Sequence, residues 1–368
     1  MKKVIILADS VNPFNDFLFN NLHSSDSFEV FVYYRINTPS LYKWNIEDNK
    51  KFKYKFYRSA FWIDFSVLKD IIINKNASYI QIGYNGLTNV FSILLLGLLK
   101  RKWIYWTDTP YPSYFSGFKG KLRFYFFKFI YNSVKVFFTT GISSIDFFVE
   151  NGFNEYKLLN FPFFLDLNIS YYYQSLGREI AMSKFHIKSE DYHFVFLMSG
   201  RLIKSKGFCN GIKYLEWLKK RSIKCKLLIA GLGPDKQYLE ELAHSIGVQD
   251  DVSFVGWLND QDLDAFYKAG DFFLHMPEFD PFPTVVIQAM IYSKPVIGYT
   301  SAGTINDRVI DYANGLKING LYDEAFFTLL TNVMENKHII CEMGKEARIT
   351  AEEWPVQRGI KIIQSVLS

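Results

Sequence analysis

The sequence contains few of the residues that cross-link small domains or bind metals. It has three cysteines and six histidines among 368 residues. Cys209, Cys225 and Cys341 are odd in number, widely spaced and form no CxxC pair, which argues against a disulfide framework and a zinc site. We expect reduced, mostly buried thiols in a cytosolic protein. The histidines show no ligand spacing, so no metal site is predicted.

Long hydrophobic runs are also missing. The longest run, NVFSILLLGLL at 89–99, is shorter than the about 20 residues that one bilayer crossing needs. We predict a buried helix there. The N-terminal run in MKKVIILADS ends at Asp9 before it is long enough for a signal peptide. It is typical of the first strand of a parallel sheet.

No strong excess of either charge is present. The net charge is +5 and the pI is near 8.7, which gives no reason to expect a nucleic-acid partner. Hydrophobic residues make up 49% and charged residues 21%, as in a folded globular protein. There is no internal repeat or low-complexity tract. The length favours two domains.

Short apolar segments alternate with helical patterns in both halves of the chain, which is the signature of βαβ units with parallel sheets. The sequence therefore predicts an α/β protein with two Rossmann-like domains facing each other across a cleft. Ligands of such sheets sit beyond the carboxyl ends of the strands. The predicted strands are 3–9, 28–34, 79–83, 102–108 and 135–141 in the first half, and 193–200, 226–233, 252–256, 271–276 and 294–300 in the second.

The predicted domains are an N-terminal domain at 1–168 and a C-terminal domain at 169–345. The join follows LLNFPFFLDLN, where the polar and aromatic segment 169–185 breaks the alternation. Residues 346–368 are predicted as a terminal helix.

Three loops of the second half carry the candidate chemistry. In MSGRLIKSKGF, Gly200 permits a tight turn, and Arg201 and Lys206 supply two cations that suit a diphosphate. Gly231 and Gly233 in LLIAGLGP suit either close approach to a ligand or a tight turn from strand to helix. DPFPTVVIQAM, 280–290, predicts a loop that leads into a helix whose N-terminus can hold an anion.

These segments resemble, in order and spacing, the nucleotide-binding domain of family-4 (group 1) glycosyltransferases, a retaining family of the two-Rossmann-domain GT-B class. The resemblance covers roughly residues 193–318, and weaker matches lie near the end of the first domain and in the terminal helix. It rests on GRLIKSKGF, LLIAGLGP, VSFVGWLNDQDLDAFYKAGDFFL, DPFPTVVIQAM, KPVIGYTSAG and NGLKI.

The resemblance implies the roles of the site residues. Arg201 and Lys206 would bind the donor diphosphate, Asp280 the transferred sugar, and Gln288 the ribose. The remaining donor-binding positions that it implies are Gly200 and Gly231, Trp257 and Leu258 near the base, and Pro283, Thr284 and Val285 near the phosphates at the helix N-terminus.

Three positions depart from the family pattern. The family has Glu, Glu and Gly where this chain has Asp280, Gln288 and Pro283. An amide in place of a ribose-binding carboxylate costs about 1 kcal/mol. A shorter carboxylate needs the loop to move closer, because a misplacement of about 1 Å can reduce the rate about a hundredfold. An active enzyme and a degenerate relative that only binds are the two alternatives.

The acceptor side has weaker signals. Asp108, in YWTDTPYPS, either orients an acceptor hydroxyl or caps its loop. The segment 117–135 mixes five cations, Lys119, Lys121, Arg123, Lys128 and Lys135, with four aromatic residues, Phe124, Phe126, Phe127 and Phe129. It is either a helix that lies on an anionic membrane or a domain helix with core aromatics and solvated lysines.

The resemblance thus implies a retaining hexosyltransferase, and the lack of a predicted metal site favours metal-independent transfer. It also implies that 1–168 is the acceptor side, that 169–345 binds the nucleotide sugar and that the helix at 346–368 crosses back to the first domain. The expected donor is a nucleotide sugar, with UDP preferred to GDP, and the expected acceptor is a saccharide or lipid-linked saccharide of a bacterial surface glycan. No cofactor is expected, and the enzyme would act in the cytoplasm or at the inner face of the membrane. The alternatives are a non-catalytic nucleotide- or glycan-binding relative, a sugar-nucleotide epimerase and a phosphorylase. The DxD pattern of Asp262 and Asp264 falls on a predicted helix, where alternate residues point apart.

Overall fold

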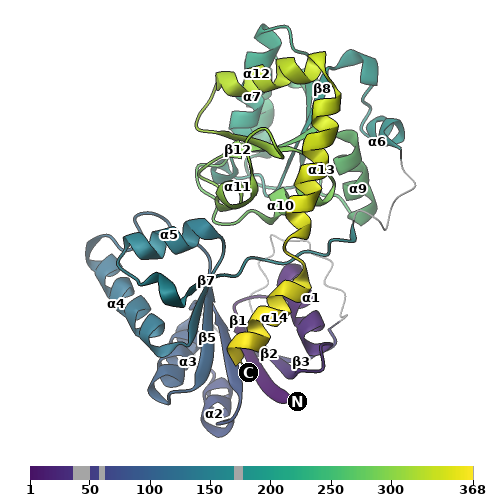
Figure 1. The fold of residues 1–368 in the computed structure, drawn as a ribbon. Coiled ribbons are helices and arrows are strands. Elements are labelled where there is room, and N and C mark those ends of the chain that lie inside the picture. The colour runs from purple at the N-terminus through teal and green to yellow at the C-terminus, as the bar shows by residue number, and fades with distance from the viewer. Residues whose placement is uncertain (36–49, 58–62, 170–176, 368) are drawn as a thin grey trace. The chain divides into compact units, whose positions relative to one another are not determined.

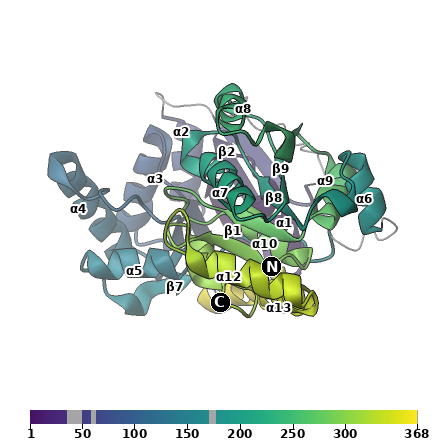
Figure 2. The same cartoon turned by 90° about the horizontal axis from the view of Figure 1, so that it is seen from above.

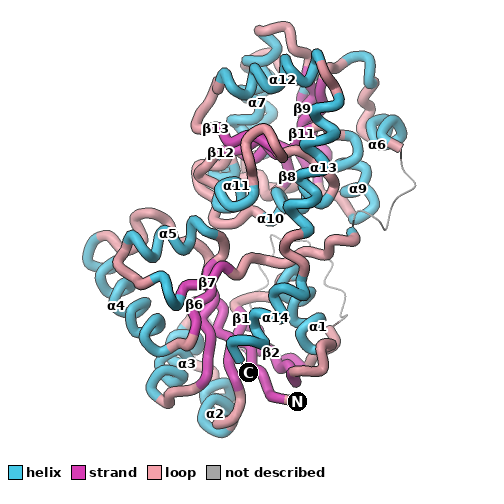
Figure 3. Tube along the Cα trace, viewed as in Figure 1, coloured by secondary structure: helices cyan, strands magenta, loops and turns pink. Residues whose placement is uncertain are grey.

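The computed structural model describes residues 1–35, 50–57, 63–169 and 177–367. The chain forms two compact units, one of Met1–Asp166 and Trp354–Ser368, and the other of Leu167–Glu353. Each unit holds one parallel sheet with helices around it (Figures 1 and 3). The predicted α/β class with two Rossmann-like domains is confirmed. Residues 170–176 of the expected join lie outside the described residues.

Unit 1 is built on a seven-stranded sheet of order β3-β2-β1-β4-β5-β6-β7. All pairings between its strands are parallel. Its strands are β1 Lys2–Ala8, β2 Phe28–Arg35, β3 Lys53–Tyr57, β4 Ser78–Ile82, β5 Lys102–Thr107, β6 Val136–Thr139 and β7 Leu158–Asn160. Its helices are α1 Pro13–His23, α2 Phe65–Ile73, α3 Leu87–Leu98, α4 Gly117–Ser133, α5 Ile142–Glu150, the 3-10 turn η1 Glu155–Lys157 and α14 Val356–Leu367.

The side chains of β1 alternate between two cores, as a buried strand requires. Val4 and Ile6 pack with α1 and α14 on one face of the sheet. Ile5 and Leu7 pack with the second layer of helices, α2 to α5, on the other face. The two faces explain why β1 is apolar along its whole length.

Unit 2 is built on a six-stranded parallel sheet of order β10-β9-β8-β11-β12-β13. Its strands are β8 Phe194–Ser199, β9 Cys225–Ala230, β10 Val252–Gly256, β11 Phe272–His275, β12 Val296–Tyr299 and β13 Gly315–Ile318. Its α-helices are α6 Arg178–Lys184, α7 Phe208–Lys220, α8 Lys236–Ser245, α9 Asp260–Ala269, α10 Thr284–Ile291, α11 Gly303–Arg308, α12 Glu324–Glu335 and α13 His338–Glu352. Its 3-10 turns include η3 Ser189–Asp191, η4 Lys204–Lys206 and η5 Gln249–Asp251.

Two layers of helices cover the sheet of unit 2. Helices α7, α8, α12 and part of α13 contribute to one core with the strands (Figure 2). Helices α9 and α10 contact β8, β11 and β12. The sheet is therefore buried on both faces, as the apolar strand sequences predicted.

The sequence did not predict three of the strands, which are β3, β7 and β13. β3 and β7 form the two edges of the first sheet and β13 is one edge of the second. β3 has the sequence KYKFY and is largely exposed, while β7 spans three residues and β13 four. Short or exposed edge strands lack the continuous apolar run that identifies a central strand.

The predicted buried helix is α3, and it is buried on one face only. Asn89, Ser92 and Leu96 are buried, whereas Phe91 and Leu98 are exposed. The prediction was wrong about the second face, because an apolar run also supplies the outer side of a helix that borders the sheet. No helix within the described ranges is long and apolar enough to cross a bilayer.

The terminal helix α14 packs in unit 1. It lies beside α1 (Figure 1), and Ile363 and Val366 join the core that faces α1. Lys102 Nζ donates to the Leu367 carbonyl at 2.9 Å and Lys135 Nζ to the Val366 carbonyl at 2.8 Å. These cations satisfy carbonyls at the C-terminus of the helix, where positive charge is favourable.

The chain returns to unit 1 after Glu353, whereas the predicted second domain ended at residue 345. The difference arises because α13 belongs to unit 2 over its whole length. The break at Pro355 separates α13 from α14, since proline cannot continue a helix interior.

Each sheet has one point where the strand order reverses. In unit 1 it lies between β1 and β4, and in unit 2 between β8 and β11. The loops beyond the carboxyl ends of the strands at such a point form the crevice in which open parallel sheets bind ligands. Ligand-binding residues are therefore expected at these two crevices.

We expect Ile363→Ala to lower the free energy of unfolding by about 2 to 4 kcal/mol, because it removes a fully buried side chain and leaves a cavity. Ile349→Ala is the matched control, since Ile349 in α13 is 50% exposed, and should change stability by about 0.5 kcal/mol or less. Urea unfolding measures both. Equal effects of the two variants would contradict a core role for α14.

Candidate functional site

The predicted donor residues gather at the carboxyl edge of the sheet of unit 2. Gly200 and Arg201 follow β8, and Gly231 follows β9. Trp257 follows β10, and Asp280 lies in the loop between β11 and α10. Because all these strands are parallel, their following loops share one edge. This is the edge that the order of the motifs predicted.

An ion pair joins the loops on the two sides of the reversal point. Lys206 Nζ lies 2.6 Å from Asp280 Oδ2, and His275 Nε2 lies 3.1 Å from the same oxygen. The Asp280 side chain is 7% exposed and that of Lys206 is 32% exposed. A buried histidine and a partly exposed lysine therefore both contact the same oxygen of the Asp280 carboxylate.

The backbone of Asp280 is fixed as well. It forms a parallel bridge with Ala302, its N-H donates to the Ser301 carbonyl at 3.3 Å, and its carbonyl accepts from Gly303 N-H at 2.9 Å. A side chain at Gly303 would meet the Pro281 carbonyl at 2.0 Å, so the two loops need glycine there. The donor loop is thus anchored to the loop after β12.

Asp280 remains ionised despite its burial. Burial alone would raise the pKa of this carboxyl group, but hydrogen bonding to His275, the charge of His275 and the interaction with Lys206 together lower the pKa below its ordinary value. The site therefore presents a carboxylate, rather than a carboxylic acid, to a ligand at neutral pH.

Gly207 positions Lys206. It adopts the left-handed conformation with φ 73°, and a Cβ there would lie 1.7 Å from the Met276 carbonyl oxygen. The same carbonyl accepts from Asn210 Nδ2 at 2.9 Å. The turn that carries Lys206 therefore packs directly on the backbone that follows β11, and only glycine permits this approach.

Arg201 contributes a hydrogen-bond donor that is not used by the described residues. Its Nε is buried and has no hydrogen-bond partner among the residues that the structure describes. A buried guanidinium N-H without a partner is costly, and an anionic ligand would satisfy it. Arg201 and Lys206 belong to the same loop, so both can approach one diphosphate.

The glycines after β9 allow this loop to pack against the loop after β8. A Cβ at Gly231 would lie 1.8 Å from the Gly200 carbonyl, and one at Gly233 would lie 2.2 Å from the Leu202 carbonyl. Of the two explanations that the sequence left open, the tight turn against a neighbouring backbone is the one for which the structure shows contacts. Gly200 itself, at φ 143°, has an open side, with only Phe208 near a hypothetical Cβ.

Trp257 presents a large aromatic surface beyond β10. It is 46% exposed, and Leu258 beside it is partly exposed. An exposed indole just beyond the edge strand β10 has the form needed to stack on a planar ring. The prediction of a base-binding role for Trp257 and Leu258 stays a prediction.

Helix α10 begins at Thr284 after Pro283, which stands at the N-cap position. Proline is compatible with this place because the first amides of a helix have no partner within it. Thr284 and Val285 are partly exposed and bring the first amides of α10 to the edge of the site. This arrangement can hold an anion, as the sequence indicated.

Gln288 is oriented by a buried tyrosine. Tyr267 Oη donates to Gln288 Oε1 at 3.3 Å, and burial raises the pKa of this phenol well above its ordinary value. The amide oxygen is thereby occupied, and the amide N-H₂ of the partly exposed Gln288 is available as a donor. A neutral amide can therefore bind a ribose hydroxyl by donating to its oxygen.

The two aspartates of the DxD pattern point to different partners. Asp262 lies on the exposed side of α9 and pairs with Lys184, while Asp264 is buried and pairs with Lys268. The predicted helical position of this pattern is confirmed. Within the described part of the chain, no three histidine, cysteine or carboxylate side chains form a group suited to a metal ion.

Asp108 lies beyond β5 in unit 1. Thr140 Oγ1, beyond β6, donates to Asp108 Oδ1 at 2.8 Å, and Asp108 as a whole is exposed. Asp108 therefore ties two loops together, as the capping alternative requires. Its exposure is compatible with the acceptor alternative.

The basic, aromatic segment 117–135 contains α4, Gly117–Ser133, and its four named aromatic residues follow the alternative of a domain helix with core aromatics. Phe127 is buried, and Phe124, Phe126 and Phe129 pack against the core of unit 1. The exposed apolar residues are instead Phe118, Leu122 and Tyr125, at 79%, 58% and 70% exposure. The alternative with core aromatics is therefore confirmed for the four named aromatic residues, and the membrane alternative stays a prediction.

The cysteines differ in burial. Cys225 is buried in β9, Cys209 is partly exposed, and Cys341 is exposed on α13. The expectation that the thiols are mostly buried is therefore wrong for Cys341. All three are free thiols.

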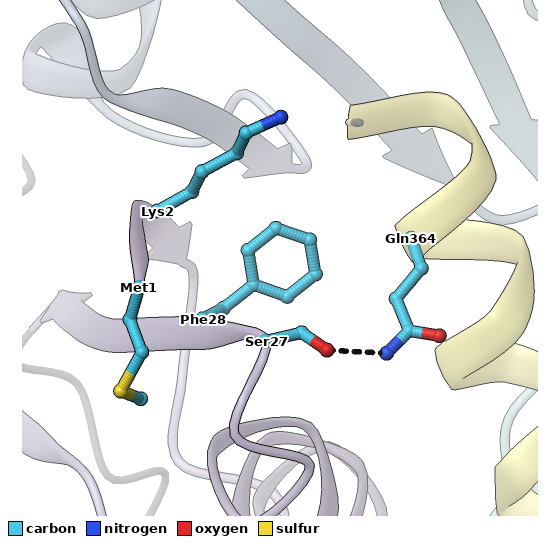
Figure 4. A pocket seen from close by; sticks show the side chains of 5 residues that line it. All are labelled: Met1, Lys2, Ser27, Phe28 and Gln364. Carbon is cyan, nitrogen blue, oxygen red and sulfur yellow. Dashed lines mark hydrogen bonds between the residues drawn. The ribbon is translucent and has the colours of Figure 1, made fainter.

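A surface pocket lies in unit 1, at the edge of the sheet where the amino-terminal ends of the strands meet. Met1, Lys2, Ser27, Phe28 and Gln364 line it, and Gln364 Nε2 donates to Ser27 Oγ at 2.7 Å (Figure 4). It lies at the amino-terminal ends of β1 and β2. Ligands of open parallel sheets bind at the other ends of the strands, so we do not assign the site to it.

Two residues of the site were missed from the sequence. His275 ends an apolar strand, and its only signal was its position five residues before Asp280. Tyr267 lies in α9, 21 residues before Gln288, and its hydroxyl contact could not be read from spacing. Both support predicted residues from the side opposite to the open edge.

Comparison with known proteins shows that this part of the chain is similar to glycosyltransferases. Residues 180–353 match the family described as glycosyl transferases group 1. An uncharacterised glycosyltransferase of Methanocaldococcus jannaschii is 29% identical over 168 residues, which are 46% of this chain and 39% of that protein. A lipopolysaccharide core biosynthesis glycosyltransferase of Rhizobium meliloti is 30% identical over 110 residues, which are 30% of each chain. This chain thus matches less than half the length of either relative.

Solved structures share the whole architecture. The HepE protein of Anabaena, solved in complex with UDP and glucose, superimposes with a TM-score of 0.77 at 15% identity. The superposition covers 100% of this chain and 99% of that one. At this identity it establishes the fold, which is the GT-B fold that the sequence predicted.

We expect Gly207→Ala to destabilise the protein by at least about 2 kcal/mol more than Gly247→Ala. Both glycines have φ 73°, but a Cβ at Gly247 meets nothing within 4 Å, whereas one at Gly207 meets the Met276 carbonyl. The backbone cost of about 1 kcal/mol is therefore common to both variants, and the difference isolates the contact. Chemical denaturation measures it, and equal losses would refute the close approach.

Proposed function

Since residues 180–353 belong to the group 1 glycosyltransferases, we propose that the whole chain is a retaining, metal-independent hexosyltransferase. Its donor is a nucleotide sugar, and its acceptor is a saccharide or lipid-linked saccharide. The observation that carries the proposal is the contact of Lys206 with Asp280 across the point of strand reversal, next to the unsatisfied Arg201 Nε.

In the proposed reaction, the donor diphosphate takes the place of Asp280 as the partner of Lys206. Arg201 supplies further N-H donors, and the first amides of α10 face the same edge. Negative charge that develops on the departing nucleoside diphosphate is then stabilised by cations fixed before the reaction. This supply of positive charge is the reason to propose transfer without a metal.

Asp280, released from Lys206, remains held by His275 at 3.1 Å. A carboxylate in this position accepts hydrogen bonds from hydroxyl groups of the transferred sugar. It is one methylene shorter than the glutamate of the family pattern, and the anchored loop from Asp280 to Gly303 determines how far it reaches. Gln288 donates its amide to the ribose, in keeping with its contact to Tyr267.

We propose UDP as the donor nucleotide in preference to GDP. The support is the similarity of the fold to the Anabaena protein that was solved with UDP and glucose. The exposed Trp257 and the adjacent Leu258 would receive the base. The similarity to a lipopolysaccharide core glycosyltransferase supports a role in surface glycan synthesis in the cytoplasm or at the inner face of the membrane.

Helix α4 is the proposed membrane contact. Phe118, Leu122 and Tyr125 are spaced by four and three residues, which places them on one exposed face of the helix. Lys119, Lys121 and Arg123 are exposed around them. An apolar stripe with cations beside it suits the surface of an anionic bilayer, where a lipid-linked acceptor would be presented.

The donor proposal predicts slow hydrolysis or transfer with at least one UDP- or GDP-hexose, and no loss on addition of EDTA. Lys206→Met should reduce turnover by about a hundredfold or more. Lys204→Met is the control, because Lys204 lies on the same turn and is exposed, and it should leave turnover within about twofold.

Release of nucleoside diphosphate, measured beside the melting temperature of each variant, tests this prediction. Binding of nucleotide sugar without turnover would favour the non-catalytic alternative. An altered sugar released without an acceptor would favour an epimerase, and a requirement for inorganic phosphate would favour a phosphorylase.

The membrane proposal predicts binding to vesicles that contain phosphatidylglycerol. Phe118→Ser with Leu122→Ser should weaken this binding by about tenfold or more, since two exposed apolar side chains no longer enter the bilayer. Ile180→Ser with Ile349→Ser is the control, because these exposed residues belong to unit 2. Co-sedimentation measures the binding, and equal affinity of the two double variants would exclude α4 as the contact.

A further inference from the structure

The outer face of α3 is apolar, although part of its inner face is polar. Three polar residues of this helix are almost completely buried in unit 1, namely Thr88, Asn89 and Ser92. On the solvent side, Leu87, Phe91 and Leu98 are spaced by four and seven residues, which places them along one face. All three are exposed, and Leu98 is 72% exposed. An ordinary surface helix has polar residues on its outer face, so the outer face of α3 needs another explanation.

Helix α2 extends this apolar face. Phe65 and Ile72 lie two turns apart on its outer side and are 74% and 50% exposed, and Ile73 is exposed beside Ile72. The inner side of α2, with Val67 and Ile71, belongs to the core of unit 1. Exposed apolar residues thus occupy the outer sides of two helices that follow each other in the chain. A contiguous apolar surface of this kind indicates an interaction site.

Contacts at the ends of the helices keep these faces side by side. Arg101, which follows the end of α3, donates from Nε to the Ile71 carbonyl at 3.1 Å and from Nη2 to the Ile72 carbonyl at 2.8 Å. On the other side of α3, Gly97 allows close contact with α4, because a Cβ there would lie 2.6 Å from the Phe129 ring. Helices α2, α3 and α4 therefore form one continuous layer beside the sheet (Figure 1).

The exposed charges around the face of α2 and α3 are positive. Lys69 in α2, Lys75 beyond its end and Lys100 beyond α3 are exposed. The sequence from 63 to 101 contains two acids, and both have partners within unit 1. Asp64 accepts from the backbone of the first turn of α2, and Asp70 accepts from a tyrosine hydroxyl of β2. The face is thus an apolar surface bordered by lysines.

We infer that the outer face of α2 and α3 docks on an anionic bilayer and is a second membrane contact beside that of α4. The exposed leucine, isoleucine and phenylalanine side chains enter the boundary between headgroups and acyl chains, and the lysines meet anionic headgroups. The inference deepens the proposed membrane contact and does not depend on the transfer reaction.

The charges argue against a second copy of this chain as the occupant. A two-fold contact places the same surface on both sides, so Lys69, Lys75 and Lys100 would face a surface with the same cations. Like charges oppose such an association. An acidic protein would satisfy the charges, but the apolar and basic surface continues across α2, α3 and α4 and is not confined to one groove. This extent suits a bilayer better than a single docked segment.

Co-sedimentation with vesicles of phosphatidylcholine, with and without phosphatidylglycerol, tests the inference. Phe91→Ser with Leu98→Ser should weaken binding to the anionic vesicles by about tenfold or more, because two exposed apolar side chains no longer enter the bilayer. Lys69→Gln with Lys100→Gln should weaken it by about tenfold as well, but only where phosphatidylglycerol is present.

Ile142→Ser with Val149→Ser is the matched control. The two residues are exposed on α5 in the same unit, with the same spacing of seven residues as the pair on α3. The charged residues of α5 are the acids Asp146 and Glu150, so this helix does not suit an anionic surface. Vesicle binding of the control should stay within about twofold of that of the unchanged protein.

Melting temperatures show whether each variant folds. If Phe91→Ser with Leu98→Ser does not fold, Phe65→Ser with Ile72→Ser on α2 decides, and the same tenfold loss is expected. Binding to anionic vesicles that remains unchanged in the decisive variant overturns the inference. Light scattering then shows whether the face joins two copies, since a dimer of the unchanged protein would become a monomer in that variant.

The inference and the proposed function fail separately, because release of nucleoside diphosphate is measured without vesicles. Loss of vesicle binding in the α4 variant but not in the α3 variant overturns the inference and leaves the α4 contact. Turnover of a nucleotide sugar by a protein whose vesicle binding ignores both the α2 and the α3 pairs overturns the inference and leaves the transferase. Binding through α2 and α3 without turnover of any nucleotide sugar overturns the transferase and leaves the membrane surface.

Discussion

The contact between Lys206 and Asp280 is the interaction on which the arrangement of the candidate donor site depends. It joins the loop after β8 to the loop after β11, the two loops that flank the point of strand reversal. Lys206 reaches this position because Gly207 packs on the Met276 carbonyl, and Asp280 is fixed by His275 and by the backbone of Ser301 and Gly303. The two charges are therefore held at one place before any ligand arrives. In the proposed reaction an anion competes with Asp280 for Lys206, which would couple ligand binding to the release of Asp280.

The sequence predicted the central strands because a strand buried on both faces requires a continuous apolar run, as in β1 and β8. It could not predict the edge strand β3, whose alternation of lysine and aromatic residues leaves one side in water. The same reasoning explains the site. Arg201, Lys206 and Asp280 follow predicted parallel strands, so their common edge was predictable from order alone. His275 was not, because a histidine at the end of a buried strand gives no sign of which loop it will support.

The amide at Gln288 illustrates a limit of reading one residue at a time. Considered alone, Gln288 is a neutral amide where the family pattern has a glutamate. In the structure, its oxygen accepts from the buried Tyr267 hydroxyl, which has a strongly raised pKa and remains a donor. A carboxylate in the same place would be a partner for that donor too, but it would leave no N-H for a ligand. In the proposed ribose contact, Gln288 would therefore supply the donor where a glutamate would supply the acceptor.

Both sheets place a carboxylate and a cation where their strand order reverses, but the pairs are built differently. In unit 2 the cation, Lys206, comes from the far side of the reversal point and stands in the crevice itself. In unit 1 the cation, Arg35, comes from β2 on the near side, and the group across the crevice is the neutral amide of Asn85. The crevice of unit 2 also holds Arg201, whose buried Nε has no partner among the described residues, so it offers donor capacity beyond the ion pair and is suited to an anion. In the crevice of unit 1, Arg35 matches the charge of Asp9 one to one and the amide of Asn85 completes the contact across the reversal point, so these described groups leave no surplus cation there.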